Sequence, residues 1–281
     1  MSIAAVAKKD FRDAIRSRLM IAVAVMFVAF TGGGVALGNA VGLESGTVVA
    51  LILTVMLGGT AIFVPLVSLG IAYRAIAGER ASGSLKLLLS LPNSRLDVVI
   101  GKFIGRSAVV SVAVVIGFIS MLVAAAASFD GDIQPETILM FMLAALLLAI
   151  VFVSIAVSIS AFAESTFAAA IGGFGFFVLF QFAWQGVIFL LRYVANGFET
   201  PDFGLGTEPP EWVEVLTIVN PMNGWRQSTR WLLRRVSDQQ ETAQTSVDAF
   251  YLEPWFGFVV LALWIVLPLV VGYLRFESSD L

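Results

Sequence analysis

Six long stretches without a charged residue constrain this chain more than any other feature of its sequence. Each is 21 to 29 residues long, and a helix needs about 20 mostly apolar residues to cross the hydrocarbon core of a bilayer. Backbone groups in lipid must be hydrogen-bonded internally, and membrane β-strands are shorter and alternate in polarity. The sequence therefore predicts an all-α, polytopic membrane protein, a single domain with six transmembrane helices. The six predicted spans are Leu19–Leu43, Ser45–Tyr73, Ser107–Phe129, Thr137–Ala163, Ser165–Leu191 and Pro254–Leu274.

The composition excludes several classes of function. Hydrophobic residues make up 59% of the chain and charged residues 13%, about half the charged fraction of a soluble domain. The net charge is −3, so the chain lacks the basic character of a nucleic-acid-binding protein. Cysteine and histidine are both absent, which removes disulfides, thiolate nucleophiles and histidine acid–base chemistry. We expect no catalytic residue, cofactor or metal site in this chain.

The distribution of lysine and arginine predicts the orientation in the membrane. Residues 1–18 carry five of these side chains and residues 74–106 carry six, whereas residues 130–136 carry none. Short loops rich in lysine and arginine face the cytoplasm. The sequence thus predicts a plasma-membrane protein with both termini cytoplasmic, including the tail at 275–281, and with 192–253 as a large external loop.

Two segments outside the spans have the periodicity of amphipathic helices. Residues 1–18 should form an interfacial helix on the inner leaflet, because apolar residues recur there at helical spacing between charged ones. Those apolar residues are Ile3, Val6, Ala7, Phe11, Ala14 and Ile15. In the external loop, Trp225–Val236 predicts a short helix at the outer headgroup level with tryptophan as its anchor.

The cytoplasmic segment 74–106 predicts a helical hairpin. Leu85, Leu88 and Leu89 share one helical face and form an apolar ridge. Pro92-Asn93-Ser94 is a turn signal, and a second helix begins near Arg95 and continues into the third span. The residues alone leave open whether this hairpin is a loop floating at the membrane surface or a docking surface for another protein.

A string of short motifs in this hairpin carries a family resemblance. The string comprises Gly78-Glu79-Arg80, Ser82-Gly83-Ser84-Leu85, Leu88-Leu89, Leu91-Pro92, Ser94-Arg95 and Gly101-Lys102. It resembles the signature of ABC-2-type permeases, the membrane subunits of type V, exporter-like ABC transporters. The external Asn220-Pro221 followed by Trp225-Arg226 is similar to the subgroup that includes the nitrous-oxide reductase maturation permease.

The resemblance implies that the hairpin is a coupling helix seated in a groove of a separate ATPase subunit. The implied coupling residues are Glu79, Arg80, Leu85, Leu88, Leu89 and Arg95. Two ATPase copies would bind ATP and Mg and would work with two permeases, either identical or related. This chain itself is expected not to be an enzyme, since Gly101-Lys102-Phe103 lacks the remaining residues of a phosphate-binding loop.

Small residues in two spans could bring helices close together. The first span contains Gly34, Gly38 and Gly42 at four-residue spacing, and the fifth contains Gly172 and Gly173. These glycines predict a dimer interface, with packing inside the chain as the alternative.

Gln181 and Gln185 lie one helical turn apart in the fifth span. Polar side chains in lipid need partners, so this pair could line a substrate path or join two helices.

The leading hypothesis is a permease subunit that exports a substrate across the plasma membrane, driven by a partner ATPase. A non-transporting scaffold or regulatory subunit is an alternative, because a fold does not fix a function. A polytopic membrane enzyme is a weaker alternative, since such enzymes place histidine, cysteine or clustered acids at the interface. The uncharged spans also argue against an ion-coupled secondary transporter.

Overall fold

The computed structural model describes residues 2–40, 45–90, 94–128, 135–200, 209–235 and 249–278. Among these residues, six helical stretches are long and apolar enough to cross a membrane. They are Arg18–Leu37, Leu57–Ser82, Arg95–Ala127, Pro135–Phe162, Thr166–Ala195 and Phe256–Glu277. The prediction of an all-α polytopic membrane protein with six transmembrane helices is confirmed.

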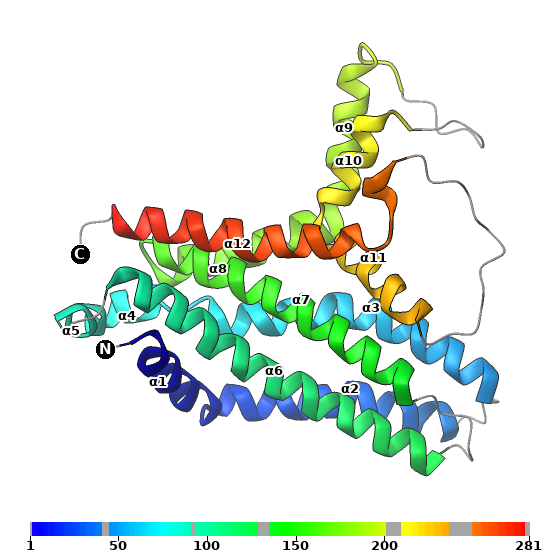
Figure 1. Ribbon diagram of the computed structural model, residues 1–281, viewed down its shortest axis with the longest axis horizontal. Helices are drawn as coiled ribbons and strands as arrows, with labels where there is room; N and C mark the ends of the chain where they lie inside the picture. Colours follow the sequence, from blue (N-terminus) through cyan, green and yellow to red (C-terminus); the bar gives the residue numbers. More distant parts are fainter. Residues whose placement is uncertain are drawn as a thin grey trace.

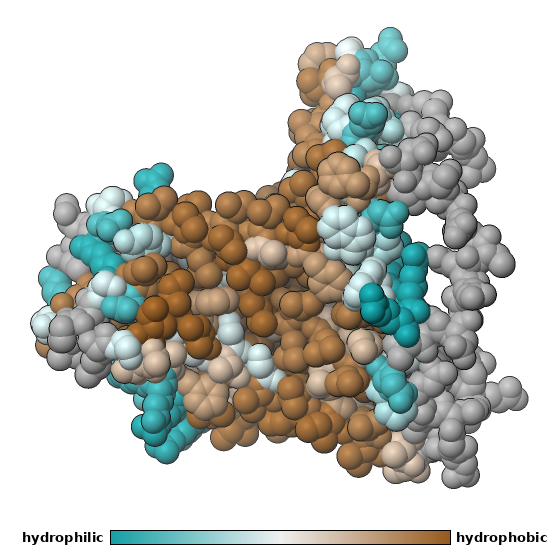
Figure 2. Space-filling model, in the orientation of Figure 1, coloured by the Kyte–Doolittle hydropathy of each residue, from teal (hydrophilic) through white to brown (hydrophobic). Residues whose placement is uncertain are grey.

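Five long helices run along the length of the molecule (Figure 1). They are α2 (Arg18–Ala40), α3 (Ser45–Ala72), α6 (Arg95–Ser128), α7 (Pro135–Phe162) and α12 (Phe256–Glu277). Helix α7 is the central one, because it packs against α3, α6, α8, α11 and α12 and almost all of its second half is buried. Figure 2 shows hydrophobic residues covering the middle of the bundle and hydrophilic residues gathered at its two ends, as expected for a membrane-spanning body.

The fifth span is interrupted. It begins as α8 (Thr166–Val178), continues through the π-helix η1 (Leu179–Ala183) and ends as α9 (Trp184–Ala195). After η1 the chain leaves the bundle, so that α9 projects sideways beside α10 (Glu211–Val219) (Figure 1). A π-turn inserts one extra residue into the helical repeat, and such turns occur often at functional sites.

The two ends of the bundle carry different elements. At one end, called here the hairpin end, lie α1 (Ile3–Ile15), α4 (Ala77–Ser82), α5 (Ser84–Ser90) and both termini (Figure 1). Gly83 joins α4 to α5 with a φ of 76°, a left-handed conformation that favours glycine. The opposite end, called here the loop end, carries α9, α10, α11 (Pro221–Arg234) and the 3₁₀ turn η2 (Phe250–Leu252).

Helix α6 is longer than a bilayer requires. Its 34 residues correspond to about 51 Å of helix, against a hydrocarbon core of about 30 Å. The charged side chains Asp97, Lys102 and Arg106 all lie in its first part, so that part extends beyond the hydrocarbon at the hairpin end. Helix α1 and the hairpin helix α4 both contact this part of α6.

Helix α11 is attached to the bundle by a buried tryptophan. The fully buried Trp225 donates a hydrogen bond from Nε1 to the carbonyl of Ala144, 2.8 Å away. The helix packs against α7 and α12, so Trp225 is part of the protein core and does not act as the membrane anchor of this helix. Its apolar face meets protein rather than lipid. Helix α10 was not predicted, and the turn at Pro92-Asn93 lies outside the described residues.

Candidate functional site

Helix α1 crosses α6 where two glycines remove the side chains from α6. A Cβ atom on Gly101 would lie 2.6 Å from Cβ of Val6, and one on Gly105 would lie 2.9 Å from the carbonyl oxygen of Ala7. Glycines four residues apart therefore let the two backbones approach closely, as in membrane helix pairs. Val6 and Ala7 are both buried in this contact.

The α1–α6 crossing brings four charged side chains together. Lys102 Nζ lies 2.8 Å from Glu79 Oε1 and 3.3 Å from Asp10 Oδ1. Arg106 Nε lies 2.9 Å from Asp10 Oδ2, and its guanidinium also donates to the carbonyl of Ile71. We call Asp10, Glu79, Lys102 and Arg106 the charge cluster. It connects α1, the end of α3, the hairpin helix α4 and α6.

The charge cluster is largely shielded from solvent. Lys102 is 2% exposed and Asp10 is 6% exposed, while Glu79 and Arg106 lie closer to the surface. Two carboxylates and two cations balance, so no net charge is buried. Removing one member of a buried pair commonly costs about 3–5 kcal/mol, because it leaves an uncompensated charge. The cluster therefore fixes the position of α4 relative to α1 and α6.

A second set of contacts ties the hairpin to the end of α7. Arg80 donates hydrogen bonds to the carbonyls of Ala161 and Ala163, at 2.9 and 2.5 Å. The hydroxyl of Ser160 accepts hydrogen bonds from the backbone N–H groups of Ile76 and Ala77, both at 3.0 Å. The last carbonyls of a helix lack partners within it and carry a partial negative charge, so an arginine there is favourable.

Arg95 makes the equivalent contact with the end of α12. Its guanidinium donates to the carbonyls of Phe276 and Glu277. The fully buried ring of Phe276 also lies within cation–π distance of Arg95 and Arg80, at 5.4 and 5.8 Å. The hairpin helix α4 is thus attached to α7 through Arg80, and the start of α6, which follows the hairpin, is attached to α12 through Arg95.

The leucines of α5 divide between the inside and the outside of the chain. Leu85 and Leu88 are 1% and 8% exposed and belong to the main hydrophobic core, with Leu89 packed partly against it. Leu87 points outward and is 72% exposed, next to the exposed Lys86. The sequence-based ridge thus packs on the bundle, and the outward face of α5 carries Lys86 and Leu87.

Comparison with known proteins identifies the family. The family model described as "ABC-2 family transporter protein" matches residues 4–281, nearly the whole chain. This chain belongs to the ABC-2 transporter family. The family resemblance seen in the hairpin sequence is therefore confirmed.

Two relatives of this ABC-2 protein carry the name "Probable ABC transporter permease protein NosY". The one from Stutzerimonas stutzeri is 30% identical over 226 residues, covering 79% of this chain and 78% of the relative. The one from Pseudomonas aeruginosa is 29% identical over 204 residues, covering 70% and 73%. These relatives agree with the subgroup similarity noted at Asn220-Pro221. The chain is the membrane subunit of an ABC transporter, it is not itself catalytic, and it works with a separate ABC ATPase subunit.

The glycines and glutamines of this ABC-2 permease do not gather at one place. A Cβ on Gly172 would meet Ile159 of α7 at 2.8 Å, and one on Gly173 would meet Leu69 of α3 at 3.1 Å. Both glycines therefore pack inside the chain. In the first span, Gly34 is exposed, Gly42 lies outside the described residues, and so do the surroundings of Gly38.

The two glutamines differ in environment. Gln181 lies in η1, and its Oε1 atom is buried without a hydrogen bond from the described residues. Gln185 lies in α9 and is exposed. The extra residue of the π-turn rotates the side chain of Gln185 relative to that of Gln181. The two glutamines therefore do not share a helix face, as regular helical spacing would predict.

The π-turn is held by the Asn-Pro motif at the loop end. The buried Asn220 donates from Nδ2 to the carbonyl of Phe180 in η1, at 2.8 Å, and its Oδ1 accepts the N–H of Met222. Asn220 thus caps the start of α11, and Pro221 occupies the first helical position, where no N–H is needed. The motif joins the bend in the fifth span to α11.

Replacing Asn220 should therefore weaken this joint in two separable steps. Asn220→Ser keeps an oxygen that can cap α11 but leaves the Phe180 carbonyl without its donor, at a cost of about 1–3 kcal/mol. Asn220→Ala also removes the cap, which adds about 1 kcal/mol. Thermal unfolding of the purified variants should rank wild type above Asn220→Ser and Asn220→Ser above Asn220→Ala. Equal midpoints for all three proteins would contradict the dual role.

The sequence contains a signal for the charge cluster, although the predicted sites included only Glu79 of its four members. Asp10 falls on the apolar stripe of α1, three residues after Ala7 and four before Ala14. Lys102 likewise follows the buried Val98 and Val99 and precedes Arg106 by one turn. A charge on an otherwise apolar face requires a partner, and opposite charges on two such faces predict that the faces meet.

Proposed function

We propose that this chain is the permease subunit of an ABC exporter in the plasma membrane, with the hairpin end in the cytoplasm and a separate ATPase docked on α5. One observation carries the docking proposal. The outer face of α5 exposes Leu87, while the opposite face and the flanking segments are tied to α1, α6, α7 and α12. A large exposed apolar side chain on a firmly held element suits a protein contact.

The attachments of the hairpin suggest how movement would be transmitted. ATP and Mg would bind entirely within the ATPase subunits, whose closure would push on the outer face of α5. Arg80 and Arg95 would carry that displacement to the ends of α7 and α12, and the charge cluster would carry it to α6 and α1. The hairpin would then move the cytoplasmic ends of several helices together. Rearrangement of packed helices by rigid-body movement is a common switching mode.

The proposed assembly contains two ATPases and two permeases, with the second permease either a copy of this chain or a related one. The fifth span is the least buried of the six, with exposed side chains that include Phe167, Ile171 and Val178. Helix α2 likewise exposes Leu37 near Gly34. These outward faces of α2 and α8 support a dimer contact built from the first and fifth spans.

Leu87→Asp is expected to abolish association with the ATPase while leaving the permease folded, because an aspartate on the exposed face disrupts an apolar contact without touching the core. The measurement is co-purification of the ABC ATPase with the tagged permease from its native host, identified by mass spectrometry and by ATP hydrolysis. Ile104→Asp is the matched control, since Ile104 is 45% exposed and lies off α5, on the part of α6 that extends beyond the hydrocarbon. Retention of the ATPase by Leu87→Asp would place the docking surface elsewhere.

Orientation can be tested separately, because the chain contains no cysteine. A membrane-impermeant maleimide added to intact cells should label Glu199→Cys at the loop end and spare Ser90→Cys on the hairpin. Both residues are exposed, so permeabilised cells should label both. Labelling of Ser90→Cys from outside would reverse the proposed orientation.

A further inference from the structure

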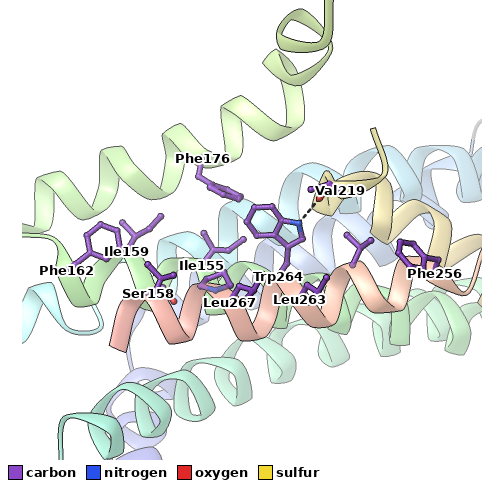
Figure 3. A pocket seen from close by; sticks show the side chains of 13 residues that line it. Ile155, Ser158, Ile159, Phe162, Phe176, Val219, Phe256, Leu263, Trp264 and Leu267 are labelled. Atoms are coloured by element: carbon purple, nitrogen blue, oxygen red, sulfur yellow. Dashed lines mark hydrogen bonds between the residues drawn. The ribbon is translucent and has the colours of Figure 1, made fainter. Parts of the chain in front are cut away.

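A lateral groove lies between α8 and α12, with α7 contributing the third wall (Figure 3). Its volume is about 410 Å³, within the range of ligand pockets, roughly 300–1,000 Å³. The lining includes Ile155, Ile159, Phe162, Phe176, Leu267 and Val271. Leu267 and Val271 are 55% and 53% exposed, so the groove opens towards the membrane.

The described lining of the groove offers a ligand no free side-chain hydrogen-bond donor. Two of the described lining residues carry a polar side-chain atom, Ser158 and Trp264. The Ser158 hydroxyl donates to the carbonyl of Ser154 at 2.7 Å, and Trp264 Nε1 donates to the carbonyl of Val219 at 2.7 Å. Water needs several polar partners to occupy a cavity. The occupant that fits this surface is therefore apolar.

The dimensions of the groove select among apolar occupants. The lining extends along α12 from Phe256 to Val271, a rise of about 22 Å. A volume of 410 Å³ spread over that length makes the groove narrow, and a whole helix of a second copy, about 10 Å across with its side chains, does not enter it. A single extended hydrocarbon chain fits it.

A cation lies at the hairpin-end mouth of the groove. Leu263, Leu267 and Val271 follow one another at four-residue spacing on α12, and the next position in this row is the exposed Arg275. Arg275 lies in the last turn of α12, which ends at Glu277. An arginine at a span end reaches the headgroup level. The neighbouring carboxylate of Glu277 accepts a hydrogen bond from Tyr273.

We propose that this groove binds one acyl chain of an anionic phospholipid from the leaflet at the hairpin end, with the lipid phosphate paired to Arg275. Leu267 and Val271 form one edge of the acyl-chain site, and Phe162 and Ile159 form the opposite edge. The site depends neither on ATPase docking nor on the direction of transport. It makes a bound lipid part of the contact between the fifth and sixth spans.

The test uses the full chain in nanodiscs of phosphatidylcholine that contain a small fraction of phosphatidylglycerol with a photoactivatable diazirine on one acyl chain. After illumination, adducts assigned to single residues should concentrate on Ile155, Ile159 and Phe162 of α7 and on Leu263, Leu267 and Val271 of α12. Leu267→Trp fills the groove and should lower this labelling about tenfold, the effect of excluding two methylene groups from an apolar site. Val266→Trp is the matched control, because Val266 is 52% exposed but does not line the groove.

The headgroup contact is tested with a matched pair of probes. Wild type should be labelled more strongly by the phosphatidylglycerol probe than by a phosphatidylcholine probe with the same acyl chain, and Arg275→Gln should remove that preference. Arg16→Gln, at another exposed arginine of the hairpin end, should retain it. Equal labelling of Leu267→Trp and Val266→Trp, or adducts spread evenly over Val266 and Val270, would overturn the acyl-chain site. Equal labelling of wild type by both probes would overturn the pairing with Arg275.

Discussion

Lys102→Met is expected to lower the free energy of unfolding by about 3 kcal/mol, the lower end of the range for breaking a buried ion pair. Methionine can fill the space of the lysine stem, but it leaves Asp10 and Glu79 with Arg106 as the one remaining cation of the charge cluster. Since Lys102 is 2% exposed, water cannot enter the site to solvate the carboxylate that has lost its partner. The melting temperature should fall by roughly 5–10 °C.

The matched control is Lys86→Met, which makes the same chemical change on the exposed face of α5 and should leave the melting temperature nearly unchanged. A second variant separates charge from packing. Glu79→Gln restores electrical balance when combined with Lys102→Met, so the double variant should be more stable than the sum of the two single effects. Strict additivity would show that Lys102 acts through packing rather than through its charge.

Lipid solvation is the reason that the spans could be predicted from the sequence. Each span must be a helix, and each excludes charge from the hydrocarbon, so uncharged runs identify them with no tertiary information. The same criterion does not locate the ends of a helix. The uncharged run begins at Ser107, whereas the turn signal at Pro92-Asn93-Ser94 predicted a helix start near Arg95, which is where α6 begins, because uncharged length reports the depth of lipid and not the extent of a helix.

In the hairpin, helical periodicity predicts which residues share a face but not what that face contacts. Periodicity placed Leu85, Leu88 and Leu89 on one face, but an apolar face is equally suited to the chain's own core and to another protein. The structure resolves this ambiguity in favour of the core for Leu85 and Leu88. It leaves Leu87, which the ridge pattern omitted, as the outward residue. Whether an apolar helix face packs on the chain's own core or on another protein depends on tertiary packing. The local sequence pattern does not contain that information.

The bend of the fifth span had no local signal either. A π-turn depends on a donor for a displaced carbonyl, and here that donor is Asn220, 40 residues further along the chain from Phe180. The nine-residue helix α10 does carry a local signal, since prolines precede it and two acids lie in its first turn. A helix this short is marginal without tertiary contacts, so its start signal was not enough to predict it.

Gly105→Val is expected to detach α1 from the bundle while the spans remain folded. A Cβ at this position would lie 2.9 Å from both the carbonyl oxygen of Ala7 and Oδ2 of Asp10, and 3.0 Å from Cβ of Asp10. Relief requires the backbone of α1 to move, and overpacking of this kind costs about 1–3 kcal/mol before the disturbed charge cluster is included. A 13-residue helix is marginal in water once its packing is lost.

Detachment should expose α1 to protease. In detergent, trypsin should cleave Gly105→Val at Lys8 and Lys9 about tenfold faster than wild type, the change expected when local opening becomes about 1.4 kcal/mol easier. Gly175→Val is the control, because a Cβ atom on Gly175 would have no described atom within 4 Å, and its cleavage should match wild type. If both variants were cleaved at the wild-type rate, close α1–α6 packing would not be what holds α1. The charge cluster alone would then have to anchor α1 on α6, and the Lys102→Met variant would show the accelerated cleavage instead.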